Sequence, residues 1–163
     1  MAHPRYMEDD NAPAQILVGV DGSDSSIEAL RAAARIATAM DARIKAVMTW
    51  EYPAKFYTTP GLSPETDARN MLSDAVARAF GTDLPAGMDS AALYGPPARV
   101  LIEQSATADL LVLGSRGHGG FTGLLLGSVS TAVSQHAQCP VLITHHAERS
   151  KITGRAHGSK ATI

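Results

Sequence analysis

The sequence contains a single cysteine, Cys139, among its 163 residues, so no disulfide can form within the chain. Aromatic residues make up only 5%, and no apolar run is long enough to span a membrane. The formal net charge is −2, which excludes a basic surface large enough to bind nucleic acid or an anionic membrane. A secretory signal peptide is also missing, and together these absences predict a cytoplasmic protein.

The composition is that of one ordinary globular domain, with 45% apolar and 18% charged residues. Residues 1–14 have no apolar period, and residues 147–163 are basic with little apolar content. We therefore expect a flexible N-terminal arm over 1–14, one domain over 15–146 and a flexible basic tail over 147–163.

Short apolar runs alternate with segments whose apolar residues recur at helical spacing. Strands are expected at 16–20, 43–50, 90–94, 109–113 and 141–144. Helices are expected at about 25–40 and 65–80, from Pro97, and from Gly127 or Ser128, with Ser25 and Glu28 forming a capping box. This alternation predicts an α/β fold with a single open, doubly wound, parallel five-stranded sheet and helices on both faces.

A glycine-rich loop follows the fourth expected strand and runs from Gly114 to Ser128. Glycines let backbone N–H groups approach an anion, and the helix that follows adds unpaired donors at its N-terminus. Between residues 110 and 147 there is no aspartate or glutamate, and the one formal charge is Arg116. The loop therefore favours phosphate binding. The alternative for the loop is a plain connection that ends in a helix cap. The alternative for Arg116 is a solvent-exposed charge that contacts no phosphate.

Commoner phosphate motifs do not fit. The chain has no GxxxxGK[ST] sequence, and Thr122 stands where the last glycine of GxGxxG would be. No nucleophile has a neighbouring base in the loop, so no catalytic residue is indicated. His145 and His146 have no acidic or cysteine neighbours, so no protein-held metal site is indicated.

The loop does match G-x2-G-x9-G-[ST] through Gly114, Gly117, Gly127 and Ser128. With this spacing, and with the segments 18–23, 95–97, 109–114 and 139–143, the chain resembles the universal stress protein family over roughly residues 15–145. The resemblance implies strand order 3-2-1-4-5 and an adenine-nucleotide site. By position, Asp21, which directly follows the first strand, would contact the ribose. Alternatively, its carboxylate has the purely structural role of forming an Asx turn.

The resemblance further implies that Gly19 and Val20 line the same pocket and that Thr49 lies against adenine, where ATP-binding relatives often have an aliphatic residue. Arg116 is added on its charge alone, because its guanidinium could contact phosphate. The remaining residues implied around the ribose and phosphates are Leu113, Gly114, Gly117, Gly127, Ser128, Val129 and Ser130.

The family comparison thus predicts a protein that binds ATP, with Mg²⁺ held largely by the phosphates, and acts as a nucleotide-dependent regulator of the stress response. Two alternatives stay open: a slow ATPase or self-modifying phosphoryl- or adenylyl-transfer protein, and a cyclic AMP-binding protein. A homodimer is expected through the last strand, which carries Val141, Leu142 and Ile143 at an apolar sheet edge.

Overall fold

The computed structural model describes residues 13–52, 63–117 and 126–145. The predicted N-terminal arm up to residue 12, the predicted tail over 147–163 and the middle of the glycine-rich loop, residues 118–125, lie outside the described residues.

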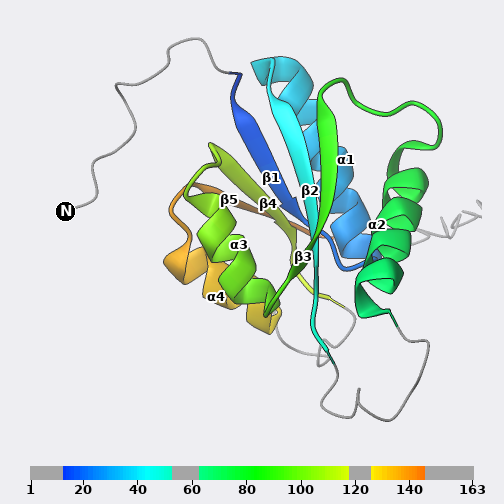
Figure 1. The fold of residues 1–163 in the computed structure, drawn as a ribbon. Coiled ribbons are helices and arrows are strands. Elements are labelled where there is room, and N and C mark those ends of the chain that lie inside the picture. Colours follow the sequence, from blue (N-terminus) through cyan, green and yellow to red (C-terminus); the bar gives the residue numbers. More distant parts are fainter. Residues whose placement is uncertain (1–12, 53–62, 118–125, 146–163) are drawn as a thin grey trace, which may run out of the picture.

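Strands and helices alternate along the described chain, as predicted (Figure 1). The first strand runs one residue earlier than predicted, the third begins at Met88 rather than residue 90, and the fourth runs one residue later than predicted. The elements are β1 (Gln15–Gly19), α1 (Asp24–Met40), β2 (Arg43–Trp50), α2 (Pro64–Phe80), β3 (Met88–Tyr94), α3 (Pro97–Ser105), β4 (Leu110–Gly114), α4 (Ser128–His136) and β5 (Val141–Thr144).

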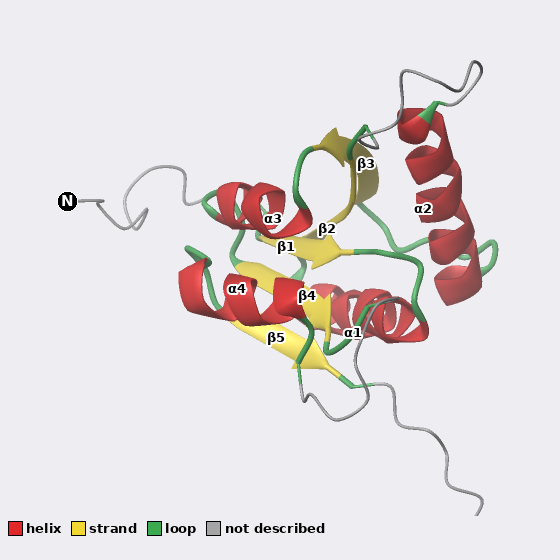
Figure 2. Cartoon of the chain, turned by 90° about the horizontal axis from the view of Figure 1, so that it is seen from below, coloured by secondary structure: helices red, strands yellow, loops and turns green. Residues whose placement is uncertain are grey.

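The five strands form one parallel sheet in the order β3-β2-β1-β4-β5, which confirms the predicted topology. β1 lies at the centre, where Val18 pairs with Ala46 of β2 and with Val112 of β4. Helices α1 and α2 cover one face, and α3 and α4 cover the other (Figures 1 and 2). From Ile16 to Gly19 the central strand has no polar side chain, because both of its faces are buried there.

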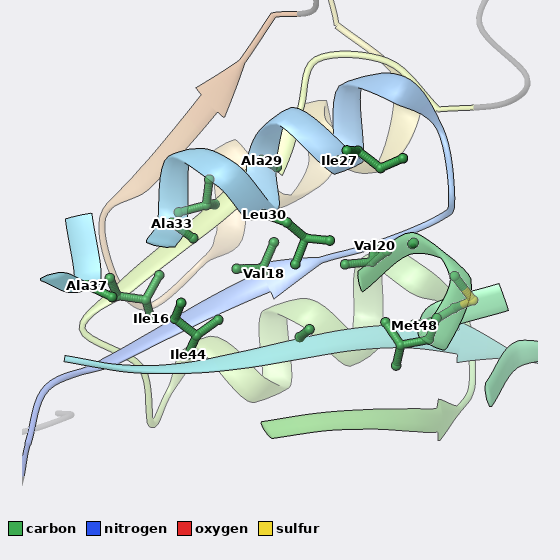
Figure 3. Packing of buried hydrophobic residues seen from close by; sticks show 14 of the residues in the cluster. Ile16, Val18, Val20, Ile27, Ala29, Leu30, Ala33, Ala37, Ile44 and Met48 are labelled. Carbon is green, nitrogen blue, oxygen red and sulfur yellow. The ribbon is translucent and has the colours of Figure 1, made fainter. Parts of the chain in front are cut away.

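The core on the α1 side is built from alternate residues of β1 and β2 packed against one stripe of α1. Figure 3 shows Leu30 and Ala33 of α1 directed toward Ile16 and Val18 of β1. Leu17, between those two β1 residues, points to the opposite face and joins the α3 and α4 core. The period-two alternation of a strand thus supplies both cores from one five-residue segment.

The start of α1 corrects one prediction. Ser23, not Ser25, is the N-cap residue: its backbone is extended (φ −70°, ψ 159°) and its side chain accepts a hydrogen bond from the Ser26 N–H. Gly22 makes the preceding turn with φ of +83°. The predicted capping box at Ser25 is wrong because Ser25 already lies within the helix.

Among the described residues, none of the helices combines the length and the apolar character that crossing a bilayer requires.

Candidate functional site

The candidate site exists because neighbouring strands end at different heights. β1 stops at Gly19, which pairs with Val47, whereas β2 continues to Trp50. The chain leaves β1 through a sharp turn at Gly22 and opens a space beside the end of β2. A cavity of about 620 Å³ occupies this position at the carboxyl ends of the strands, a size typical of ligand pockets.

All twelve residues that the sequence comparison assigned to a nucleotide site line this one cavity. Whether they contact a ligand stays a prediction. They come from β1, β2, β4 and α4 and from the connections that follow the strands: Gly19, Val20, Asp21, Thr49, Leu113, Gly114, Arg116, Gly117, Gly127, Ser128, Val129 and Ser130.

Sequence reasoning missed the lining residues that depend on distant packing. α2 reaches the cavity only because it packs on α1 and β2, a contact that no local pattern encodes. The serines of the first turn of α1 could have been found from their closeness to Asp21. The additional residues are Ser23, Ser25, Ser26, Val47, Met48, Trp50, Glu51, Pro64, Asp67, Ala68, Met71, Pro97 and Leu101.

The backbone after β4 is fixed with its carbonyl groups turned into the protein. The Gly114 carbonyl accepts a 2.7 Å hydrogen bond from the Ser130 hydroxyl, and the Ser115 carbonyl accepts one of 2.8 Å from the Gly127 N–H. Both donors belong to α4 or its cap, so the two ends of the glycine-rich loop are tied together.

The next carbonyl, that of Arg116, accepts a hydrogen bond from the hydroxyl of Ser25. Ser25 lies in the first turn of α1 and is 7% exposed. Three successive carbonyl oxygens of the loop thus have partners inside the protein. Because carbonyl oxygens repel anions, this arrangement suits an anion site.

The N-terminus of α4 adds donors to the cavity. Its cap residue is Gly127, which has no side chain to occupy the free N–H groups, and the first helical hydrogen bond runs from Thr131 to Gly127. The N–H groups of Ser128, Val129 and Ser130 therefore precede the helical ladder, at the positive end of the helix dipole. The Ser130 hydroxyl donates to Gly114, so its donor capacity lies in its backbone N–H.

Three glycines of the loop differ in what a Cβ would meet. A Cβ at Gly114 would lie 2.7 Å from the carbonyl carbon of Ser25, and one at Gly117 would strike the carboxylate of Asp21. At Gly127 the nearest atoms, in Ser115 and Arg116, would be 3.7 Å away, an ordinary contact distance. A side chain at Gly127 would therefore touch the described protein atoms without overlapping them.

Charges in the cavity are of both signs. Asp21 accepts hydrogen bonds from the Ser23 N–H (3.0 Å) and hydroxyl (2.5 Å), so the Asx-type interaction expected at this turn is present. Glu51 and Asp67 bring two further carboxylates, and Arg116 brings a guanidinium that forms no ion pair with another described residue. No group of three or more potential metal ligands occurs among the described residues.

The backbone of Thr49 faces the end of the cavity opposite the glycine-rich loop. Val47 points its carbonyl toward β1, where it accepts the Val20 N–H at 2.8 Å, and the Trp50 carbonyl points toward the β3 side, where it accepts the Gly95 N–H at 2.9 Å. Because backbone groups alternate along a strand, the N–H and C=O of Thr49 point to the β1 side. β1 has ended by then, so these two groups border the cavity.

Trp50 closes the cavity beside Thr49 and rests on two tyrosines. Its ring packs edge-on against Tyr52 (centroids 5.3 Å apart, planes at 85°) and against Tyr94 (5.1 Å, 65°). The cluster holds the indole in place at the rim.

Comparison with known proteins gives the family. A family model described as the universal stress protein family matches residues 14–145. The chain belongs to the universal stress protein family. This confirms the resemblance carried by the glycine spacing, and the match includes every element of the described fold.

A universal stress protein of Mycobacterium tuberculosis strain H37Rv is 36% identical over 135 residues, which cover 80% of this chain and 45% of the relative. The chain thus spans about half the length of the curated relatives of this kind.

Two solved structures agree with the fold. The universal stress protein UspA from Lactobacillus plantarum has a TM-score of 0.66 at 26% identity, covering 82% of this chain and 99% of its own. A universal stress protein in complex with cAMP has a TM-score of 0.57 at 32% identity, covering 82% and 98%.

Proposed function

We propose that this universal stress protein binds an adenine nucleotide, with ATP and Mg²⁺ the foremost ligand, and acts in the cytoplasm as a nucleotide-dependent regulator of the stress response. The observation that carries the proposal is the anion cradle between Gly114 and Gly127. Its carbonyl oxygens are turned away, the N–H groups at the start of α4 are available, and Gly127 has no side chain to cover them.

The backbone of Thr49 supports adenine as the base. Adenine presents a ring nitrogen that accepts a hydrogen bond beside an amino group that donates one. The N–H and C=O of one strand residue complement this edge, because the N–H donates to the ring nitrogen and the C=O accepts from the amino group. Backbone groups make this contact, so a threonine in place of the aliphatic residue common in ATP-binding relatives does not remove it.

Magnesium fits the site only as a companion of the nucleotide. The described lining residues include three carboxylates, Asp21, Glu51 and Asp67, against one guanidinium, Arg116. A triphosphate without a cation would meet more negative than positive charge in the cavity. A Mg²⁺ ion bound to the triphosphate neutralises part of the triphosphate's negative charge. The cation would lie on phosphate oxygens and water, with Asp21 the nearest carboxylate to the phosphate loop.

Cyclic AMP is a second candidate ligand. The same excess of carboxylates disfavours triphosphates relative to a singly charged cyclic phosphate. The structural neighbour in complex with cAMP is 32% identical to this chain, which also supports this ligand.

We also propose that two copies pair through β5. This strand lies at the sheet edge, where Leu142 is 37% exposed and Val141 and Ile143 are half-buried. An apolar edge of this kind is usually covered, and a second copy would cover it.

Calorimetric titration of purified protein with Mg–ATP, ATP without Mg²⁺, cAMP and Mg–GTP tests the proposal. We expect Mg–ATP or cAMP to bind at micromolar levels and Mg–GTP to bind at least tenfold more weakly. The matched variant is Gly127→Ala, whose Cβ would fill the phosphate space. Absence of binding by millimolar adenine nucleotide, or equal affinity in Gly127→Ala, contradicts the proposal.

Incubation with ATP labelled at the γ- or the α-phosphate, followed by mass spectrometry, separates binding from slow chemistry. Released phosphate or a labelled serine would identify the enzyme alternative, and unchanged ATP would leave binding alone.

A further inference from the structure

We propose that Ser25 is a positioning residue for the phosphate site: its hydroxyl fixes the peptide between Arg116 and Gly117 so that the Gly117 N–H donates to the ligand. This role rests on the proposed nucleotide binding and assigns that site a residue that the family glycine spacing does not include.

Ser25 is held rigidly enough to act in this way. It is 7% exposed in the first turn of α1, and its own carbonyl accepts a 3.3 Å hydrogen bond from the hydroxyl of Thr144 at the end of β5. Close packing against Gly114, where a Cβ would lie 2.7 Å from the Ser25 carbonyl carbon, fixes the distance between α1 and the loop. The hydroxyl therefore meets the Arg116 carbonyl in a defined place.

The peptide geometry carries the inference from that carbonyl to the N–H. No described peptide bond is cis, and in a trans peptide the C=O and the following N–H point in opposite directions. With the Arg116 carbonyl on the α1 side, the Gly117 N–H points away from α1. The cap of α4 is close to this nitrogen, since a Cβ at Gly127 would be 3.8 Å from it. The Gly117 N–H thus joins the donors of α4.

The Ser23 hydroxyl also lies 3.5 Å from the Arg116 carbonyl, but it donates to Asp21 at the shorter distance of 2.5 Å. Without the Ser25 hydrogen bond, the peptide therefore has a second arrangement available. Glycine adopts backbone conformations that other residues avoid, so the peptide before Gly117 can turn over at little cost. That turn would place the Arg116 carbonyl oxygen toward the ligand, where it repels phosphate. The Ser25 hydroxyl selects the arrangement that binds an anion.

The test compares Ser25→Ala with Ser105→Ala, using Mg–ATP and adenosine as ligands. Ser105 is an equally buried serine (1% exposed) whose hydroxyl bonds Ile102 and Gln138 away from the cavity. We expect Ser25→Ala to weaken Mg–ATP binding about three- to tenfold, the usual effect of one lost hydrogen bond, and to change adenosine binding less than twofold. Ser105→Ala should leave both affinities unchanged.

A second measurement is amide hydrogen exchange in the ligand-free protein. Exchange at Arg116 and Gly117 should become faster in Ser25→Ala and not in Ser105→Ala. Ser25→Cys keeps the shape of the side chain with a larger atom and a weaker donor, so it should show a smaller loss in the same direction, even if the alanine variant folds poorly.

Equal losses for Mg–ATP and adenosine would show that Ser25 acts through general stability, and wild-type affinity in Ser25→Ala would show that it has no role. Either result overturns the inference while nucleotide binding stands. Wild-type protein that binds neither ligand overturns the proposed function itself.

Discussion

Gly114 and Gly127 belong to one sequence motif, but protein packing requires glycine only at Gly114. The Cβ of any other residue at Gly114 would press on the backbone of Ser25, which is fixed in α1. At Gly127 the backbone (φ −71°, ψ 167°) is open to any residue and the surrounding protein atoms are at contact distance. The proposed function assigns Gly127 to binding, a difference that the spacing of the motif does not reveal.

Gly114→Ala should lower the free energy of unfolding by about 1–3 kcal/mol, because the added methyl group forces the loop and α1 apart. Gly127→Ala should cost less than about 1 kcal/mol, the difference between glycine and alanine at a helix N-cap. Urea denaturation of both variants gives these values. Equal losses in the two variants would contradict the distinction.

Cys139 is the single thiol of the chain, so its reactivity can be followed without ambiguity. Burial raises the pKa of the Cys139 thiol above its ordinary value, and the carboxylate of Asp109 raises it further. At neutral pH the thiol should therefore react with iodoacetamide more slowly than a free cysteine, since the thiolate is the reactive form. The pH at half-maximal rate should fall in Asp109→Asn, and a midpoint below that of free cysteine would contradict this account.

The helix caps show why sequence predicts elements better than their ends. Ser23 and Ser25 both carry the local signal of an N-cap residue, and the predicted capping box chose the second. In the structure Ser23 accepts the Ser26 N–H as the cap, whereas the Ser25 hydroxyl donates to the Arg116 carbonyl, 91 residues further along the chain, a contact that local sequence does not encode. The strands, in contrast, follow from their apolar runs, and only β3, with its exposed Asp89 and Ser90, was predicted too short.

At the scale of one strand, the proposed dimer depends on β5. Leu142→Asp places a charge on the exposed side chain of this edge strand and should convert the proposed dimer to a monomer, because a buried unpaired carboxylate is costly. Sedimentation velocity at several concentrations measures the change. The exposed Leu84, on the connection before β3, offers the control, and Leu84→Asp should leave the mass unchanged. A monomeric wild type would refute pairing through β5.

For the whole molecule, the predicted α/β class came from alternation, whereas the strand order came with the family resemblance. Apolar periodicity cannot tell β3-β2-β1-β4-β5 from other parallel orders, because each strand is buried in similar surroundings. The candidate site was predictable where it follows strand ends, as at Asp21 and Gly114. Its α2 wall was not, because Asp67 and Met71 reach the cavity through the packing of a whole helix.

Ligand binding should stabilise the entire domain, because the cavity is shared by both halves of the sheet. At a free nucleotide concentration 100 times the dissociation constant, the expected gain is about 2.7 kcal/mol. For a domain of this size that raises the melting temperature by roughly 5–10 °C. Differential scanning calorimetry measures it, and Trp50, the one tryptophan of the chain, should report binding by its fluorescence. An unchanged melting temperature at saturating nucleotide would contradict this expectation.

The cavity owes its existence to the five residues of β1 ending beside the eight of β2. β2 and β3 stay paired beyond the end of β1, through Thr49 and Trp50, so the sheet itself forms one wall of the cavity. Asp67, on α2, lines the cavity from a helix on one face of that sheet, outside the strand pairing. Substitutions of such wall side chains would alter the cavity's shape and charge while the strand pairing stays the same.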